Sequence, residues 1–298
     1  MSEPEHAAVP LEVDLTGWSA GAAANPLTER ERQATEVFLA ALGMTATCKN
    51  KIYLKGGILV GAVYASGRNT ADMDFSTTIA PSKGFADLLG EELQAAFPRA
   101  AAALGIPTLR LRMQSVKFHP RKDTFVEADF PAISVKFAYA KAGSKLETAL
   151  EAGTCGAVLY ADISFNEPIT CVQTVFMKGV DASILAYSLL DLVSEKFRAL
   201  LQQVTRDRYR RQDVFDLHYL LTEAGADQLS KDSLLNCFLE KCLSRGIEPN
   251  LESLNDPEVR ARAKSEWATL AQEVGYLPDF DYSFELINNF YRSMPWPN

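Results

Sequence analysis

The sequence predicts an α+β protein in which a mixed β-sheet with flanking helices is followed by a helical domain. Up to about residue 180, β-rich runs alternate with segments of helical periodicity, whereas the apolar residues after Gly179 recur only at helical spacing. Of the 298 residues, 47% are hydrophobic, so the chain can bury a substantial core. We therefore expect a loose N-terminal arm over residues 1–25, a sheet-containing core over 26–180 and a helical domain over 181–298.

The individual elements follow from capping residues and periodicity. Thr28 is a good N-cap for a first helix, which Gly43 would end. The other core elements are expected as strands at 53–54 and 72–75, helices at 58–65 and 85–104, strands at 109–118 and 132–139, a short helix at 146–150, and strands at 158–165 and 170–176. The expected helices of the C-terminal domain cover 184–203, 214–221, 229–243, 259–274 and 284–291.

Composition excludes several classes of protein. A net charge of −8 and a pI near 5.1 argue against non-specific nucleic-acid binding over the whole surface, although a local basic groove stays compatible with them. The five cysteines form no CxxC pair, so we interpret them as reduced thiols, and the three histidines make a zinc site unexpected. No apolar run approaches the ~20 residues that span a bilayer, and the N-terminus lacks a signal-peptide pattern. We expect a soluble cytoplasmic protein without a membrane partner.

A glycine pair, Gly56 and Gly57, follows the short apolar strand at 53–54. Glycine lets the backbone turn tightly and bring its N–H groups close to an anion. The helix expected at 58–65 would direct its positive end at the same turn. A glycine pair alone usually marks only a turn, and this one lacks the P-loop pattern. Its interpretation as a phosphate-facing turn therefore depends on the motif that follows it.

Two carboxylates, Asp72 and Asp74, come about fifteen residues after the glycine pair. This interval leaves room for one helix between the two motifs. Residues at i and i+2 of a strand point to the same face, so both carboxylates would lie together while Met73 and Phe75 enter the core. Carboxylate oxygens are hard ligands that suit Mg²⁺, and a two-metal site for displacement at phosphorus needs such a pair. Alone, such a pair of carboxylates more often lies on a solvated surface. Its position after the glycine turn favours the interpretation as a metal site.

Asp162 interrupts an otherwise apolar strand. A buried acid needs a partner, and a metal shared with the other two carboxylates would provide one. In that position Asp162 could hold the catalytic metal or take the proton of an attacking hydroxyl. The alternative is an ordinary acid at the rim of the sheet.

Lys196 and Arg198 flank an apolar position in the middle of a helix, so both cannot face the core. Lys196 could reach a nucleoside triphosphate as a point charge. On composition alone, an exposed helix surface with i,i+4 ion pairs is favoured. Asp213 and Asp216 lie at i and i+3 on one helical face, where they could line a cleft or pair with arginines.

Arginine is concentrated just before these two acids, at Arg206, Arg208, Arg210 and Arg211. Such a cluster could clamp the phosphates of a nucleotide or of RNA, or it could pair with acids at a helix junction. A second basic group consists of Arg110, Arg112, Lys117, Arg121 and Lys122. It is a candidate edge for nucleic acid, although an ordinary solvated strand face is the favoured interpretation.

Taken in order, these motifs resemble the nucleotidyltransferase toxins of the abortive-infection AbiEii family, within the polymerase-β-like nucleotidyltransferase superfamily. The segments that carry the resemblance are 53–57, 68–76, 161–163, 194–200 and 208–217. Together they span about residues 50–221, and the combination is far more specific than any single piece. The resemblance implies that the sheet is a nucleotidyltransferase core and that the helical domain completes the active-site cleft.

The resemblance also implies roles for single residues. Asp72 and Asp74 would bind Mg²⁺, with Asp162 as the third ligand. The residues that would contact the nucleotide are Lys55, Gly56, Gly57, Arg68, Lys196, Arg198 and Asp213, and the catalytic set would be Asp72, Asp74, Asp162, Lys196 and Asp216. The arginine cluster Arg206, Arg208, Arg210 and Arg211 would contact RNA.

The function that the resemblance implies is that of the toxin in a toxin–antitoxin pair. It would use an NTP and Mg²⁺ to add nucleotides to an RNA end, in known members the acceptor end of tRNA, and so stop translation. One alternative is nucleotidyl transfer to a protein or small-molecule hydroxyl. Another is a weakened nucleotide-binding protein acting through a partner, because Ile58 stands where the family commonly has Ser or Thr.

Overall fold

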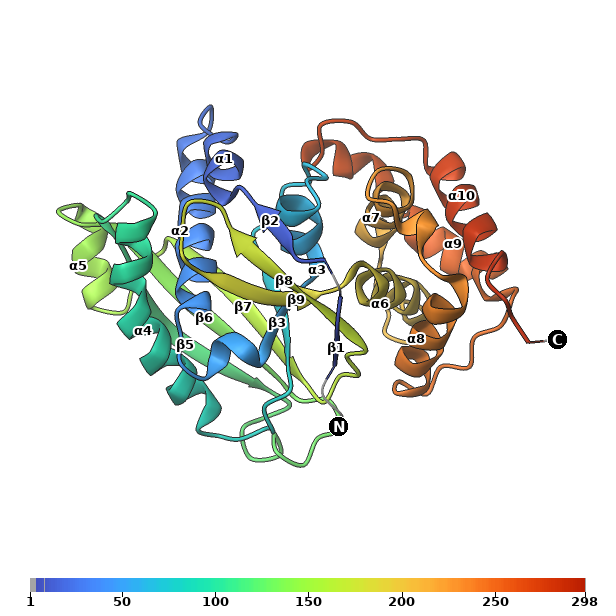
Figure 1. Cartoon of the computed structure of the whole chain (residues 1–298), viewed down its shortest axis with the longest axis horizontal. Helices are drawn as coiled ribbons and strands as arrows, with labels where there is room; N and C mark the ends of the chain where they lie inside the picture. Colours follow the sequence, from blue (N-terminus) through green and yellow to red (C-terminus); the bar gives the residue numbers. More distant parts are fainter. Residues whose placement is uncertain (1–3, 8, 298) are drawn as a thin grey trace. The chain divides into compact units, whose positions relative to one another are not determined.

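A computed structural model describes residues 4–7 and 9–297 of the chain, which folds into two compact units (Figure 1). Unit 1 comprises Met1–Val63, Ala71–Glu167 and Gln173–Ala186. Unit 2 comprises Tyr64–Thr70, Pro168–Val172 and Tyr187–Asn298. The helical unit therefore includes two short stretches from earlier in the chain, which the contiguous domains expected from the sequence did not contain.

Within the described residues, the strands form one nine-stranded mixed sheet. Its strands are β1 (Glu5–His6), β2 (Leu11–Val13), β3 (Ile52–Lys55), β4 (Met73–Thr77), β5 (Leu109–His119), β6 (Ala132–Lys141), β7 (Val158–Phe165), β8 (Cys171–Met177) and β9 (Ser183–Tyr187). They are ordered β1-β8-β9-β3-β4-β7-β6-β5, with β2 paired to β8. β4 and β7 are parallel neighbours in the middle of the sheet, although the whole of β5 and β6 separates them in sequence.

The first 25 residues contain more regular structure than the loose arm expected from the sequence. Strand β2 pairs in parallel with β8, and α1 (Leu15–Ala20) follows it. Asp14 caps α1 by accepting a hydrogen bond of 2.7 Å from the backbone N–H of Gly17. Glu36, in the next helix, accepts a hydrogen bond from Ser19, and these contacts attach the segment to unit 1.

The other helices of unit 1 are α2 (Pro26–Gly43), α3 (Gly56–Ile58), α4 (Phe85–Ala103) and α5 (Lys145–Glu151), with a 3₁₀ turn at Cys48–Asn50. The predicted cap of α2 was wrong. Asn25 is the N-cap, because its side-chain oxygen accepts hydrogen bonds from the N–H groups of Leu27 and Thr28. Pro26 takes the first helical position, where its missing N–H costs nothing.

Helices α2 and α4 pack side by side on one face of the sheet (Figure 1). Phe38 of α2 lies at the centre of this layer, with its ring centroid 4.9 Å from Phe137 and 5.9 Å from Phe75. Phe97 of α4 completes the group at 6.4 Å from Phe38. Since strand side chains alternate between faces, the residues between these aromatic positions point to the opposite face of the sheet.

Unit 2 is helical. Its helices are α6 (Leu189–Gln202), α7 (Arg211–Thr222), α8 (Lys231–Leu243), α9 (Pro257–Lys264) and α10 (Phe280–Arg292), with 3₁₀ turns at Ala226–Gln228, Ser253–Asn255 and Trp267–Gln272. Two predictions from periodicity were wrong. The expected helix at 184–203 begins as strand β9, and Ser188 caps the helix that follows by accepting a hydrogen bond from the Asp191 N–H. The expected helix at 259–274 is divided, because α9 ends at Lys264 and Glu266 has a φ of 55°.

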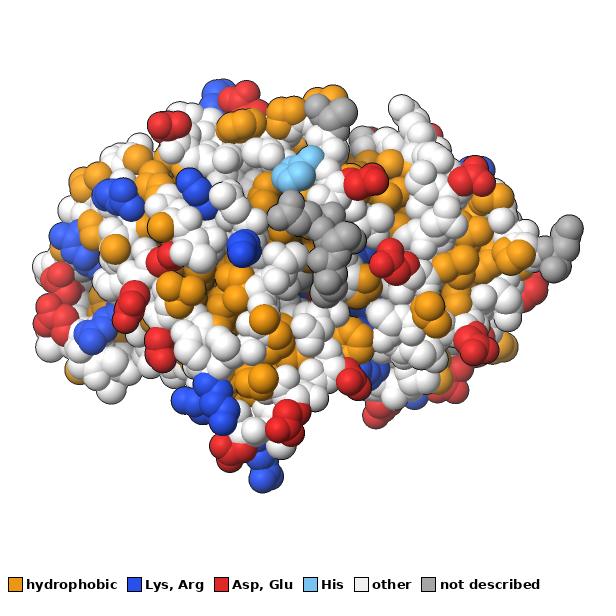
Figure 2. All heavy atoms as spheres, turned by 60° about the horizontal axis from the view of Figure 1, so that its bottom comes forward, with side chains coloured by type: hydrophobic (Ala, Val, Ile, Leu, Met, Phe, Trp, Pro, Cys, Tyr) orange, Lys and Arg blue, Asp and Glu red, His pale blue; other side chains and the backbone are white. Residues whose placement is uncertain are grey.

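The molecular surface carries both signs of charge. Figure 2 shows Lys and Arg side chains interspersed with Asp and Glu over the face in view. This distribution agrees with the net charge of −8, and any nucleic-acid contact must therefore be local. Among the described helices, none has the length and apolar character to cross a membrane.

Replacing Phe38 with alanine tests the aromatic layer of unit 1. We expect Phe38→Ala to lower the free energy of unfolding by about 3–5 kcal/mol, because it removes a fully buried ring and leaves a cavity. Leu27→Ala, on the exposed side of the same helix, is the control and should have little effect. Urea denaturation followed by circular dichroism measures both, and equal losses would contradict the proposed core.

Candidate active site

The glycine turn lies directly against the second carboxylate of the acidic pair. Gly56 follows the end of β3 with a φ of 69°, in the left-handed region that favours glycine. A Cβ placed on Gly56 would lie 2.3 Å from Oδ2 of Asp74 and 2.9 Å from its Cβ. Lys55 and Asp74 are paired residues on antiparallel strands β3 and β4, which fixes this approach. Only glycine therefore fits at this position.

The helix expected after the turn is short and irregular. α3 covers only Gly56–Ile58, and a π-helical turn over Leu59–Val63 continues it. So short a segment adds little macrodipole, and an anion at the turn would depend mainly on the N–H groups of Gly56 and Gly57. Ile58 is fully buried, so this side chain contributes to the core of unit 1.

The sheet register gathers three carboxylates at one place in unit 1. Asp74 of β4 is the direct partner of Asp162 on β7, so both side chains leave the same face of neighbouring strands. Asp72 lies two residues before Asp74, just ahead of β4. Partial burial, together with the negative charge of Asp162, raises the pKa of Asp72 above its ordinary value. The folded chain thus holds like charges near one another at some electrostatic cost.

These carboxylates fit a divalent cation by their chemistry. Their oxygens are the hard ligands that Mg²⁺ takes, and a cation would relieve the repulsion that raises the pKa of Asp72. In the part of the chain that the structure describes, no three His, Cys, Asp or Glu side chains are already gathered in a metal-binding arrangement. The three acids are therefore neighbours on one open face of the sheet, without the closed geometry of a structural metal site.

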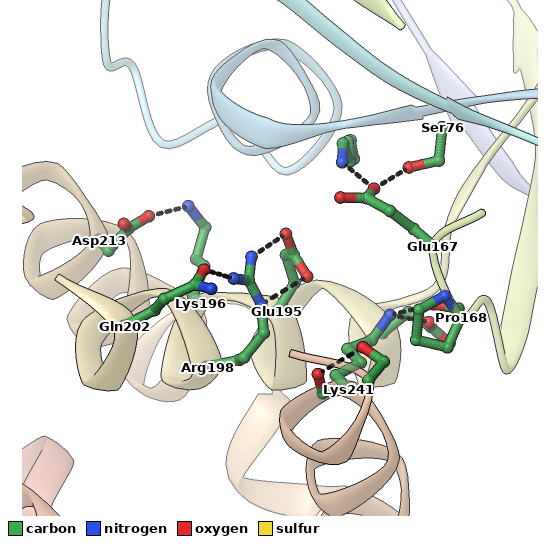
Figure 3. A network of polar contacts seen from close by, with 12 residues as sticks. Ser76, Glu167, Pro168, Glu195, Lys196, Arg198, Gln202, Asp213 and Lys241 are labelled. Carbon is green, nitrogen blue, oxygen red and sulfur yellow. Dashed lines mark hydrogen bonds and ion pairs between the residues drawn. The ribbon is translucent and has the colours of Figure 1, made fainter. Parts of the chain in front are cut away.

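The same face of the sheet contains a buried polar group that no sequence motif predicts. Lys55 forms an ion pair with Glu167, and Ser76 donates a hydrogen bond of 2.5 Å to the same carboxylate (Figure 3). All three side chains are buried. The charge of Lys55, predicted to contact a nucleotide, is thus already balanced by Glu167. No motif in the sequence marks Glu167, because only the fold brings residue 167 to β3 and β4.

Unit 2 contains a second cluster, organised around Asp216. The guanidinium of Arg68 donates to both oxygens of this carboxylate, at 2.9 and 3.1 Å. Lys196 donates to Asp216 at 2.6 Å and to Asp213 at 3.1 Å. Figure 3 shows Lys196 of α6 directed at Asp213 of α7. Asp216 is completely buried and Arg68 is 7% exposed, so the network is largely withdrawn from solvent.

Burial and ionic contacts act on this cluster in opposite directions. Desolvation tends to lower the pKa of Lys196, but the carboxylates of Asp216 and Asp213 raise it above the ordinary lysine value. Desolvation tends to raise the pKa of Asp213, whereas Lys196 and Arg210 bring it below the ordinary aspartate value. Both side chains are therefore charged at neutral pH. Lys196 is not on an exposed helix surface, which was the interpretation favoured by composition alone.

The remaining predicted arginines have varied surroundings within unit 2. Arg198 is directed along its own helix, where it contacts Gln202 and both carboxylate oxygens of Glu195, at 2.6 and 3.3 Å (Figure 3). Two members of the arginine cluster lie near acids: Arg210 is 3.6 Å from Asp213 and Arg211 is 3.4 Å from Glu266. The other two, Arg206 and Arg208, have exposed side chains.

A cavity of about 1020 Å³ in unit 1 lies away from the acidic residues. Lys51 and Tyr53, at the start of β3, and Thr77 and Thr78, at the end of β4, belong to its described lining. Since β3 and β4 are antiparallel, these positions lie at the opposite end of both strands from the Gly56 turn. The open acidic face, and not this cavity, contains the chemistry that the sequence predicts.

Along this chain, a glycine turn and an acidic pair on a mixed sheet come first. A buried lysine–aspartate cluster on helices follows them. The sequence model of the family described as nucleotidyl transferase AbiEii toxin, of type IV toxin–antitoxin systems, matches residues 37–286. The chain belongs to the AbiEii family. It is therefore a nucleotidyltransferase of a toxin family, and the match extends beyond residue 221, where the motif resemblance ended.

The solved structures that are similar to this AbiEii protein have low sequence identity to it. JHP933 from Helicobacter pylori is 12% identical with a TM-score of 0.49, and the similarity covers 91% of this chain and 92% of that one. MenT4, a nucleotidyltransferase toxin from Mycobacterium tuberculosis H37Rv, is 11% identical with a TM-score of 0.48, covering 95% of this chain and 99% of that one. Among curated proteins, no sequence matches the chain.

Neutralising Asp216 tests the buried cluster of this AbiEii protein. Asp216→Asn would leave Lys196 and Arg68 buried without their shared carboxylate, which should cost about 3–5 kcal/mol of unfolding free energy at pH 7. Asp281→Asn makes the same chemical change at the surface, beside Arg260 and Lys264, and should change stability little. Urea denaturation followed by tryptophan fluorescence measures both variants.

The same cluster should have a defined pH dependence. Because the pKa of Asp213 is lowered, its stabilisation is present above about pH 4 and is lost as pH falls through the lowered value. Because the pKa of Lys196 is raised, its stabilisation is present below about pH 10 and is lost at higher pH. A stability difference between wild type and Asp213→Asn that did not change from pH 5 to pH 2 would contradict this account.

Removing Asp162 tests the repulsion on the open acidic face. In the absence of divalent cations, Asp162→Asn should raise Tm at pH 7 by about 1–2 °C, a small gain because solvent screens the half-exposed Asp72. The raised pKa of Asp72 means that the cost exists while this group is ionised, so the gain should vanish by about pH 3. Asp123→Asn, in an exposed turn, is the matched control for calorimetry. A lower Tm for Asp162→Asn at pH 7 would refute the proposed repulsion.

Proposed function

We propose that this AbiEii protein transfers nucleotides from an NTP to the end of an RNA in an Mg²⁺-dependent reaction. The observation that supports it best is the approach of the Gly56 turn to Asp74, because it joins a phosphate-facing backbone to a carboxylate pair. The RNA hydroxyl attacks the α-phosphorus in line, a new P–O bond forms, and the bond to the leaving pyrophosphate breaks.

In unit 1, the N–H groups of Gly56 and Gly57 bind phosphate oxygens of the nucleotide. Asp72, Asp74 and Asp162 would hold Mg²⁺, which when bound neutralises charge on the phosphates and favours ionisation of the attacking hydroxyl. Asp162 is placed on β7, one strand further from Gly56 than Asp74, so it is the acid assigned to accept the proton of the hydroxyl. Lys55 contributes through Glu167, which fixes the strands around the turn.

In unit 2, Lys196 is the residue assigned to nucleotide phosphate. Its two aspartate partners keep it charged and limit its orientations, so that little side-chain entropy is lost when a phosphate binds. Asp216 positions both Lys196 and Arg68, while Asp213 supports Lys196 alone. Arg198 is assigned a weaker nucleotide contact, because Glu195 already engages its guanidinium fork.

The acceptor is proposed to be RNA, and specifically the acceptor end of tRNA, so that its modification stops translation. The exposed Arg206 and Arg208 are available for RNA phosphates, and Arg210 and Arg211 extend the same basic segment. Translation takes place in the cytoplasm, which is therefore the proposed location. The type IV toxin–antitoxin family to which the chain belongs supports an antitoxin partner.

A transfer assay tests the proposal. Purified protein is incubated with Mg²⁺, each labelled NTP and total tRNA, and the products are separated on denaturing gels for RNA and for protein. Wild type should label RNA, and Asp74→Ala should reduce the rate at least about 100-fold, because it removes a ligand of the charge-stabilising site. Gly56→Ala should cause a comparable loss, since the added Cβ would clash with Asp74.

Asp123→Ala, which removes an exposed acid from a turn, is the control and should retain wild-type activity. Label on protein instead of RNA would replace this proposal with nucleotidyl transfer to a protein acceptor. Measurable NTP binding without label on any acceptor would indicate a weakened nucleotide-binding protein. Full activity of Asp74→Ala would refute the acidic site altogether.

A further inference from the structure

We infer that the open face of the sheet beside Asp162, on β7, β6 and β5, binds the 3′ strand of the RNA acceptor. This inference rests on the proposed nucleotidyl transfer to RNA and assigns residues to the acceptor site. The four that define the proposed acceptor platform are Tyr160, Lys136, Lys117 and His119. All lie in unit 1, on the same sheet as the three acids.

The strand register aligns the platform with the acidic residues in continuous rows. Asp74 on β4 is paired with Asp162 on β7, Asp162 with Ser134 on β6, and Ser134 with Lys117 on β5. In the adjoining row Tyr160 is paired with Lys136. Because directly paired strand residues leave the same face, these side chains share the face of Asp74 and Asp162.

This face is open, while the other face of the same strands is closed. Ile133, Val135 and Phe137, which alternate with the platform positions on β6, are fully buried in the core. On the open face Tyr160 is 44% exposed, and Lys117 and His119 are also exposed. At one end α5 limits the platform, where Ala138 and Ala140 pack against Leu150 and Cys155.

On this face, acidic and basic side chains lie on different strands. The carboxylates occupy β4 and β7, whereas the lysines occupy β6 and β5. Neither Lys117 nor Lys136 forms an ion pair with a described residue, in contrast to Lys55, which Glu167 neutralises. His119 lies 3.3 Å from the hydroxyl of Ser134, which orients the imidazole on the same face. Uncompensated cations beside an exposed aromatic ring are the features that bind single-stranded nucleic acid.

In-line attack determines which side of the acids the acceptor must occupy. The attacking and leaving oxygens lie on opposite sides of the α-phosphorus. A triphosphate at the Gly56 turn occupies the β3 side of Asp74, so the attacking hydroxyl must come from the β7 side. The platform begins there.

The dimensions suit a short single strand. Lys117 is two strands from Asp162, which corresponds to about 10 Å at about 4.8 Å per strand. That distance spans about three stacked nucleotides at roughly 3.4 Å each. The geometry therefore assigns Tyr160 to stack on a base of the acceptor end. It assigns Lys136 and Lys117 to contact the phosphates that follow this base.

The test uses full-length protein and a short single-stranded RNA that ends in a 3′-deoxynucleotide, so that binding is measured without transfer. The double variant Lys136→Ala/Lys117→Ala should weaken RNA binding at least 10-fold and reduce the slope of log Kd against log salt by about 1.4, or 0.7 for each lost phosphate contact. Tyr160→Ala should weaken binding about 10-fold with an unchanged slope. With RNA that can be extended, KM for RNA should rise in each variant, while KM for NTP stays within 2-fold of wild type.

Lys141→Ala is the matched control, because Lys141 lies on β6 five residues from Lys136 and so belongs to the other face of the strand. Wild-type affinity and slope in the double variant would overturn the inference, and so would an equal loss in Lys141→Ala. If the double variant does not fold, crosslinking of 4-thiouridine RNA to wild-type protein decides: peptides within 109–119, 132–141 or 158–165 support the platform, and crosslinks elsewhere refute it. Failure of wild type to label any RNA, with label on protein, would instead refute the proposed function and its acceptor together.

Discussion

The close contact between Gly56 and Asp74 is the constraint on which the site in unit 1 depends. A backbone with a positive φ and no Cβ is pressed against a carboxylate, and the antiparallel pairing of β3 with β4 holds it there. Everything else on that face is positioned by register from this point, since Asp162 is the partner of Asp74 and the platform residues continue the same rows. The position of the Gly56 turn thus determines where acidic and basic side chains lie across the four strands β4, β7, β6 and β5.

In unit 2, by contrast, charged side chains are buried and form ion pairs with one another. Arg68, Lys196, Asp213 and Asp216 form a group of two cations and two anions, and Asp216 contacts both cations. Such a group is costly to desolvate. Its ion pairs fix the positions of the charged side chains as much as they stabilise the fold. Removing any one member leaves an unbalanced charge in a largely dry environment. The lysine that the family resemblance assigns to the nucleotide is therefore held charged before a ligand arrives.

Much of this arrangement could be predicted from local sequence. The glycine pair and the acidic pair were predicted as site residues from their spacing, and Asp162 as an acid within an apolar strand. Strand periodicity predicted β7 residue for residue, because these signals lie within one element. The Arg68–Asp216 pair could not be found in this way, since 148 residues separate its members. Nor could Glu167, whose partners lie on β3 and β4. Strand β9 was mistaken for the start of a helix because Ile184 and Leu185 continue an apolar pattern that suits either structure. Long-range pairing leaves no local signal, whereas turns and alternation do.

The division of unit 2 into three stretches has a consequence for the order of events on the ribosome. Tyr64–Thr70 and Pro168–Val172 emerge long before the helices that complete their unit. After Arg68, 148 further residues must be added before Asp216 exists, which takes roughly 7–30 s at a synthesis rate of about 5–20 residues per second. A nascent chain consequently lacks the ionic cluster until most of its length has been synthesised. For a member of a toxin family, this delay means that the buried cluster can form only after most of each molecule has been synthesised.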